Sequence, residues 1–131
     1  MRLIKNLSIA LLAVVVLAGC MKDDVKDIAF IYGTWKLTDS TLDGQPDLEE
    51  CDLKTIFVFT ADKLKTTNYY GDDCRESEIT DADYTRNGNT LTIKYQGTAI
   101  ATAEITKLSK TTLILTERDE EGVAVTTFAR Q

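Results

Sequence analysis

The sequence lacks histidine altogether, and it contains one proline and one tryptophan among its 131 residues. Without histidine, Ser-His and Cys-His nucleophilic catalysis and histidine-ligated zinc sites are excluded. Lys and Arg are fewer than Asp and Glu, with 15 against 21. Nucleic acid is therefore not expected as a partner, because phosphate binding depends on clustered cations. No segment between the strand-like runs has the period of a helix, which argues against a parallel sheet with crossover helices.

The sequence also lacks an apolar run long enough for a membrane span. Arg2 and Lys5 precede an apolar stretch from Leu7 to Leu17, whereas a transmembrane helix needs roughly 20 residues. A cationic start followed by a short apolar run is the pattern of a secretory signal peptide. We therefore expect the protein to be exported.

The end of this stretch, LAGC at 17–20, resembles the lipobox of bacterial lipoproteins. The resemblance implies that Cys20 is acylated and that the chain is cut before it. It would leave a signal peptide at 1–19, a lipidated tether at 20–29 and one domain at 30–131. Each buried methylene of an acyl chain contributes about 0.8 kcal/mol, so several chains hold a protein on a membrane. The alternative is an ordinary signal peptide that contains a cysteine.

Lys22, Asp23 and Asp24 follow the lipobox and resemble a sorting signal of some Gram-negative lipoproteins. The resemblance implies an outer-membrane lipoprotein of a Gram-negative bacterium, exposed at the cell surface. The other interpretation is a solvated tether, which leaves the choice between a periplasmic and an outward-facing domain open.

Cys51 and Cys74 remain once the lipobox cysteine is lipidated, and an even remainder in an exported protein suggests a disulfide. If the runs IFVFT and KLKTTNYY pair as a hairpin about Asp62 and Lys63, the numbers of two opposite residues sum to 125. The numbers 51 and 74 also sum to 125, so the two cysteines would face each other across the open end of the hairpin, close enough for a disulfide. Closing such a loop would contribute about 3 kcal/mol to stability. Two free structural thiols are the alternative.

From Gly33 onward, runs rich in threonine, valine, isoleucine and aromatic residues alternate with short turns such as Asn87-Gly88. Short turns predict an antiparallel meander, and eight strands in this order close most economically into a barrel, with a short helical turn at 25–32 before it. The predicted strands span 34–41, 54–60, 64–70, 78–86, 90–95, 98–107, 112–118 and 123–130.

Gly33, Thr34 and Trp35 begin the first predicted strand and match the G-x-W signature of lipocalins. Together with the lipobox, they make the chain resemble the short lipocalin-like lipoproteins of Gram-negative bacteria. In lipocalins the tryptophan closes one barrel end and an arginine of the last strand lies across it. This implies that Gly33, Trp35 and Arg130 form the barrel closure, with Arg118 as the second candidate for the arginine. Plain core packing is the alternative for Trp35.

Alternate loops of a meander share one barrel end, so the charges should be separated into an acidic mouth and a basic base. Tyr69 and Tyr70 end a strand beside the mouth, where we expect them to line a ligand site. The acidic residues lack EF-hand spacing, and no metal site is expected. The mouth loops carry Asp43, Asp47, Glu49, Glu50, Asp52, Asp72, Asp73, Glu76, Asp119, Glu120 and Glu121, and the base carries Lys63, Arg86, Lys107 and Lys110.

The first function that these features favour is a membrane-anchored module whose barrel binds a small apolar or amphipathic ligand. An eight-stranded barrel is either filled by its side chains or holds one small ligand, and Ala99, Ala101 and Ala103 on one strand face favour the ligand. The alternative is a structural or interaction lipoprotein with a packed barrel that docks a protein through its acidic rim. We expect neither a cofactor nor enzyme activity, because Asp81 and Asp83 share a strand face without a substrate cleft.

Overall fold

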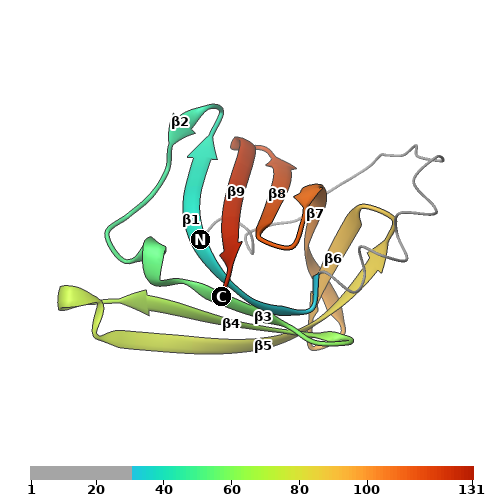
Figure 1. Ribbon diagram of the computed structural model, residues 1–131, viewed down its shortest axis with the longest axis horizontal. Helices are drawn as coiled ribbons and strands as arrows, with labels where there is room; N and C mark the ends of the chain where they lie inside the picture. The colour runs from blue at the N-terminus through green and yellow to red at the C-terminus, as the bar shows by residue number, and fades with distance from the viewer. Residues whose placement is uncertain (1–30) are drawn as a thin grey trace.

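Each long strand pairs with the next one along the chain, and the first pairs with the last, so that the sheet closes into a barrel (Figure 1). The computed structural model describes residues 31–131. The predicted eight-stranded antiparallel meander is confirmed, with one additional two-residue strand. The strands are β1 (Gly33–Leu42), β2 (Gln45–Pro46), β3 (Ile56–Phe59), β4 (Lys63–Tyr70), β5 (Glu76–Asn87), β6 (Thr90–Tyr95), β7 (Thr98–Leu108), β8 (Thr112–Asp119) and β9 (Gly122–Arg130); two 3-10 turns are η3 (Asp52–Lys54) and η4 (Asp72–Cys74).

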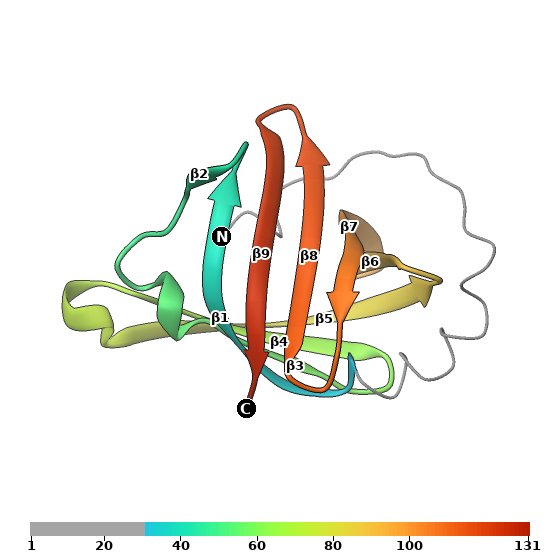
Figure 2. The same cartoon turned by 45° about the horizontal axis from the view of Figure 1, so that its top comes forward.

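β1 closes the barrel because its two halves pair with different strands. Its first residues pair with β3, where Trp35 lies opposite Phe57, and most of its length pairs with β9, where Trp35 lies opposite Arg130. Trp35 and Lys36 pair with both neighbours, and a bulge between Leu37 and Asp39 shifts the register of the β1–β9 pairing and bends β1 there. Figure 2 shows the result: β8, β9 and β1 form one wall, and β3, β4 and β5 run across it as the other.

The sequence forms these strands through alternation of apolar and polar residues. In β8, for example, Leu113 and Leu115 are fully buried, while the adjacent residues Thr112 and Ile114 are partly exposed. The inward side chains make one continuous core, whose largest fully buried members are Trp35, Phe57, Phe59, Phe128, Ile31, Leu37, Leu64, Leu91, Ile93, Leu113 and Leu115. Because residues 31–131 contain a closed barrel and its core, this segment has what a domain needs to fold by itself.

The signal peptide, Cys20, the tether and all but the last two residues of the predicted helical turn lie outside the described residues. Ile31 is buried beneath the barrel, and its carbonyl accepts a 2.9 Å hydrogen bond from the indole nitrogen of Trp35. In the described part of the chain, no helix is long and apolar enough to span a membrane.

The predicted register of the β3–β4 hairpin is wrong by two residues. Phe59 pairs with Leu64, so opposite residue numbers sum to 123 and the turn centres on Ala61 and Asp62. The turn takes this position because the backbone nitrogen of Thr60 donates to the carbonyl of Lys63 and closes a tight loop. The two cysteines still meet despite the changed register. Cys51 lies directly before η3 and Cys74 ends η4, so neither belongs to the extended strands whose register was predicted.

Bulges also change which residues face inward near the mouth. A shift between Ile93 and Lys94 in the β6–β7 pairing changes the alternation of β7, so Ala101 and Ala103 are buried but Ala99 is exposed. Tyr95, at the end of β6, is 42% exposed. The prediction that Ala99 shares the inner face with Ala101 and Ala103 is therefore wrong, because strict alternation does not continue through a bulge.

Candidate functional site: the barrel interior and its mouth

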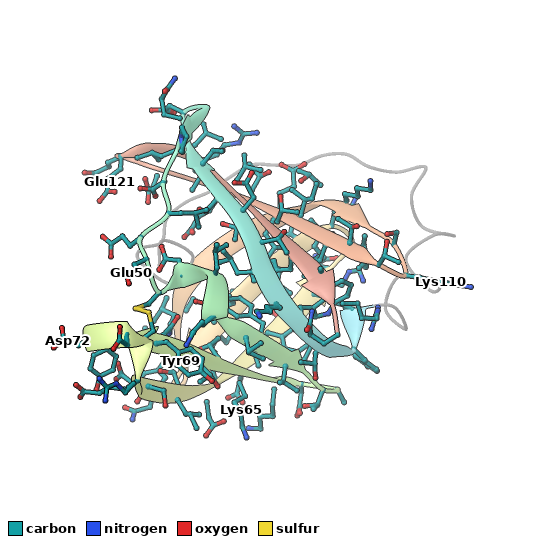
Figure 3. All side chains as sticks on the ribbon, turned by 60° about the vertical axis from the view of Figure 1, so that its left-hand side comes forward. Glu50, Lys65, Tyr69, Asp72, Lys110 and Glu121 are labelled. Carbon is teal, nitrogen blue, oxygen red and sulfur yellow. A yellow bond between two sulfur atoms is a disulfide. The ribbon has the colours of Figure 1, made fainter. Side chains whose placement is uncertain are left out.

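The topology places the loops at two opposite ends of the barrel, which we call the mouth and the base. The mouth is formed by loops 43–55, 71–75, 96–97 and 120–121, and the base by the turns β3–β4, β5–β6 and β7–β8 together with the start of β1 and the end of β9. In Figure 3, Glu50, Asp72 and Glu121 lie toward one side and Lys110 toward the other. The acidic residues thus gather at the mouth, as predicted from the sequence.

The base is closed by Trp35 and Arg130. The guanidinium carbon of Arg130 lies 4.2 Å from the centre of the indole ring, within the range of a cation-π contact. Its Nε donates to the carbonyl of Lys110 and its Nη1 to the carbonyl of Tyr32, each at 2.7 Å. Arg118, the second candidate, is exposed at the mouth end of β8.

Gly33 leaves room for this arginine. Its φ of 128° lies in a region that side-chain-bearing residues rarely adopt, and a Cβ at this position would lie 2.6 Å from Nη1 of Arg130. The glycine and the tryptophan of the G-x-W sequence therefore contact the same arginine from two sides.

Large side chains fill the base half of the interior. Phe57 packs on Phe128 with ring centres 4.7 Å apart, and Phe59 meets Tyr84 edge to face at 5.2 Å. The hydroxyl of Tyr84 donates to the carbonyl of Thr60. Burial raises the pKa of this phenol to about 12, since the charged form would lose its hydration.

Short and polar side chains line the mouth half. On the long strands that reach the mouth, the inward residues change from large apolar ones near the base to smaller or polar ones farther on. On β1 the sequence is Trp35, Leu37 and then Ser40, and on β8 it is Leu115 and then Glu117. The other short or polar members are Thr66 on β4, Ala101 and Ala103 on β7, and Ala124 and Thr126 on β9, all buried.

Glu117 is the one acidic residue among the buried side chains of residues 31–131. It is 3% exposed, and it lies directly opposite Ala124 of β9. On β4, the side chain of Thr66 is buried too, and its own hydroxyl has no hydrogen-bond partner in the described structure. Neither residue was predicted from the sequence as part of the interior. In the run LILTE, the position of Glu117 two residues after Leu115 indicates that its side chain points inward.

The disulfide between Cys51 and Cys74, predicted from the sequence, is confirmed. Its Cα atoms are 5.4 Å apart, and it ties the end of the long loop 43–55 to the loop that connects β4 and β5. The bond holds two acidic loops of the mouth in a fixed arrangement. It leaves no free thiol among residues 31–131.

Tyr69 and Tyr70 face opposite sides of the sheet. Tyr70 shares its face with Leu64 and Thr66, which point inward, and is 49% exposed beyond the rim. Tyr69 lies on the other face, where the ammonium group of Lys54 is 5.9 Å from its ring centre. Only Tyr70 therefore extends the inner surface of the barrel, since neighbouring strand residues alternate in direction.

Several mouth carboxylates organise the loops themselves. Asp43 accepts from the backbone nitrogen of Val123, and Asp119 from that of Glu121. Asp73 pairs with Arg75 at 3.2 Å. Among residues 31–131, no group of three or more acidic or cysteine side chains is placed to hold a metal ion.

Asp81 and Asp83 lie on the outer face of β5, opposite Lys65 and Lys63 of β4. Asp83 accepts a hydrogen bond from Lys63 and forms an ion pair with it, which raises the pKa of the lysine. Asp83 is thus engaged with a lysine on the surface, and both carboxylates lie on the face that points away from the barrel interior.

Comparison with known proteins agrees with this geometry. A family model described as a lipocalin-like domain matches residues 31–115. A lipocalin-like protein from Bacteroides uniformis ATCC 8492 superposes with a TM-score of 0.59 at 15% identity, covering 76% of this chain and 97% of that one. An uncharacterized protein from Bacteroides eggerthii DSM 20697 gives a TM-score of 0.58 at 12% identity, with 76% and 98% coverage.

At these identities the two solved structures share the fold with this chain. Among curated proteins, none matches its sequence. The family match covers well over half of the chain, and it includes the G-x-W segment and seven of the eight long strands in whole or part. The chain therefore belongs to the family of lipocalin-like domain proteins.

Proposed function

We propose that the protein is a lipid-anchored binding module of the bacterial cell envelope, whose barrel holds a small amphipathic molecule in its mouth half. The observation that carries the proposal is the change in inward side chains along the barrel. Large residues close the base around Trp35, whereas Ser40, Ala103 and Thr126 line the part nearer the mouth. A ligand site needs mostly apolar walls with a few polar groups, which is what this half provides.

The anchored part of the proposal is supported by the lipobox at 17–20 and by the bacterial origin of the solved relatives. The lipid at Cys20 would hold the domain at the outer membrane, and Lys22, Asp23 and Asp24 would direct it to the cell surface. Replacing Cys20 by alanine should abolish metabolic labelling with an alkyne fatty acid and release the protein from membranes. Labelling that survives Cys20→Ala would contradict the anchor.

Ligand binding can be tested with the neutral fluorescent probe N-phenyl-1-naphthylamine and the domain from residue 22 onward. The probe should fluoresce on binding to the domain. Ala103→Phe should reduce binding strongly, because the new ring would occupy the mouth half. Ala99→Phe is the matched control, since Ala99 lies on the same strand but is exposed.

Equal probe binding by the two variants would place the probe outside the barrel and contradict the proposal. The variants must first be shown to unfold cooperatively, because overpacking costs about 1–3 kcal/mol.

A docking function is the second candidate, and the disulfide favours it. Cys51–Cys74 fixes the relative positions of acidic loops, and a fixed shape suits recognition of a basic protein surface. Probe exclusion from the unmodified domain would favour this second candidate, because it requires a packed barrel.

A further inference from the structure

One edge of β5 is open over the mouth half of the strand. β5 pairs with β4 from Glu76 to Asp83, whereas its pairing with β6 includes no residue before Asp83. Within residues 31–131, therefore, no strand pairs with the β6 side of 76–82, which we call the open edge. Figure 1 and Figure 2 both show this end of the β4–β5 hairpin projecting from the barrel, away from β6.

The backbone of the open edge carries donors and acceptors that point away from β4 at alternate residues. Tyr84 donates its backbone N–H to the carbonyl of Asp62, which directly precedes β4, so the even-numbered residues of β5 direct their backbone groups toward β4. The pairing with β4 has no bulge, and the odd-numbered residues therefore direct theirs the other way. In the described part of the chain, the backbone groups of Ser77, Ile79 and Asp81 have no partner on that side.

The other edge of the hairpin is covered and held in place. η3 contacts β4, the ammonium group of Lys54 lies over the ring of Tyr69, and the Cys51–Cys74 disulfide joins the long loop to the β4–β5 connection. These contacts fix the hairpin, so the open edge is already shaped to accept another strand. Proteins often protect such an edge with proline, lysine or a bulge, and 76–82 contain none of these.

Charge favours one kind of strand at this edge. Glu76, Glu78 and Asp81 are acidic and exposed, and no basic residue lies within 76–82. A second copy of the protein would bring the same carboxylates alongside them, and repulsion between like charges would weaken the pairing. A basic peptide would bring ammonium or guanidinium groups to the same places, where opposite charges on neighbouring strands stabilise a sheet.

The two faces of the open edge favour different side chains. Glu76 and Glu78 lie on one face, and Ile79 lies on the other, where it is opposite Thr67 of β4. Ile79 is 57% exposed, more than any other large apolar side chain in residues 31–131. An added strand alternates its side chains between the same two faces. Basic residues of that strand would lie beside the glutamates, and an apolar residue would cover Ile79.

We propose that the open edge binds an extended segment of a partner protein in which basic and apolar residues alternate. The segment adds a strand to the antiparallel sheet, and its backbone pairs with Ser77, Ile79 and Asp81. At about 3.4 Å per residue, the paired stretch is roughly 20 Å long. This site lies outside the barrel interior and does not depend on a ligand there.

The test uses the synthetic peptides Lys-Val-Lys-Val-Lys-Val and Glu-Val-Glu-Val-Glu-Val with the domain from residue 22 onward. Fluorescence anisotropy of the labelled peptides should show the lysine peptide binding tighter by about ten-fold or more. Equal binding of the two peptides would overturn the choice of charge, and with it the proposed partner.

Methylated peptide separates strand pairing from simple attraction of charges. N-methylation of the valines keeps the charge of the lysine peptide but removes the N–H groups that would pair with β5. It should weaken binding by about ten-fold or more. Equal binding of the methylated peptide would assign the attraction to charge alone and overturn the added strand.

Ile79 provides a matched pair of variants. Ile79→Pro removes an N–H of the open edge, and proline is tolerated where a strand N–H faces solvent, so the barrel should remain folded. Ile79→Ala shortens the same side chain but keeps the N–H. The lysine peptide should therefore bind Ile79→Ala more tightly than Ile79→Pro, by about five-fold or more. Equal binding by the two variants would contradict pairing at this residue.

Hydrogen exchange followed by NMR locates the peptide without any substitution. In the free domain, the amides of Ser77, Ile79 and Asp81 should exchange quickly, and those of Glu78 and Thr80 more slowly, because the latter pair with β4. The lysine peptide should slow exchange at the three odd-numbered residues. Unchanged exchange there at saturating peptide would overturn the proposal. Slow exchange in the free domain that becomes fast on dilution would assign the edge to a second copy instead.

Discussion

At the scale of single residues, Arg130 connects most of the parts that close the base. It covers the indole of Trp35, bonds the carbonyl of Tyr32 before β1 and bonds the carbonyl of Lys110 in the β7–β8 turn. One side chain of β9 therefore joins the start of β1 to the β7–β8 turn.

Arg130→Ala should lower the free energy of unfolding by about 2 kcal/mol or more, from the loss of the cation-π contact and two hydrogen bonds. Arg118→Ala is the control, because Arg118 is exposed at the mouth, and it should change stability by no more than about 0.5 kcal/mol. Urea denaturation followed by Trp35 fluorescence measures both. Similar losses in the two variants would contradict the closing role of Arg130.

Tyr84 should make stability fall in alkaline solution. Its pKa is about 12 in the folded barrel and 10 in the unfolded chain, so below pH 10 both states keep the proton and its contribution is complete. Between pH 10 and 12 the unfolded chain loses the proton first, which favours unfolding.

Tyr84→Phe removes this titration along with the hydrogen bond to Thr60. The variant should be less stable by about 1 kcal/mol at pH 8, and the difference should shrink by pH 11. Urea denaturation of both proteins at the two pH values measures it. A difference that stays constant between them would show that the buried phenol does not resist ionisation.

The site residues that could be predicted from the sequence belong to a known family pattern. The residues that could not be predicted are charged or hydroxyl-bearing side chains inside the barrel. Gly33, Trp35 and Arg130 could be found because their family pattern is known. Glu117 was not identified because an acidic residue near a strand end ordinarily belongs to a solvated turn. The alternation of β8 and the burial of Glu117 in the structure show that its side chain lies in the barrel interior.

At the scale of elements, the disulfide stabilises the mouth more than the barrel. It closes a segment of 23 residues between the long loop and the β4–β5 loop. The double variant Cys51→Ser, Cys74→Ser should lose about 3 kcal/mol of stability and remain folded at room temperature.

Hydrogen exchange gives the location of this effect. In the double variant, exchange should rise most in 43–55 and 71–75, and least in β8 and β9, whose pairing does not involve the cysteines. An even rise over the whole barrel would mean that the bond stabilises the core rather than the mouth.

The existence and order of the strands could be predicted because composition and turn residues act locally. The register could not be predicted, because a bulge or a shifted turn leaves little trace in the sequence. It nevertheless changes the direction or the partner of every side chain that follows it. The β3–β4 turn, centred one residue earlier than predicted, and the shift at Ile93 and Lys94 are the two cases. Consequently Ala99, expected inside, is outside.

At the scale of the whole molecule, charge and side-chain size change along the same axis. The base holds the large apolar residues and the start of the described chain at Ile31, while the mouth holds the acidic loops. A lipid anchor that precedes Ile31 would place the base toward the membrane and leave the mouth facing away from it. In that orientation the entrance of the barrel is open to ligands from the surrounding medium.

Native mass spectrometry of the domain from residue 22 onward, secreted by its own host, tests the central claim most directly. The account predicts a mass above that of the polypeptide with its one disulfide, and the excess should disappear after mild denaturation, because the ligand is held by the folded barrel. The mass of the released molecule would then begin to identify the ligand. A bare polypeptide mass, together with a folded domain that excludes the neutral probe N-phenyl-1-naphthylamine, would contradict the account.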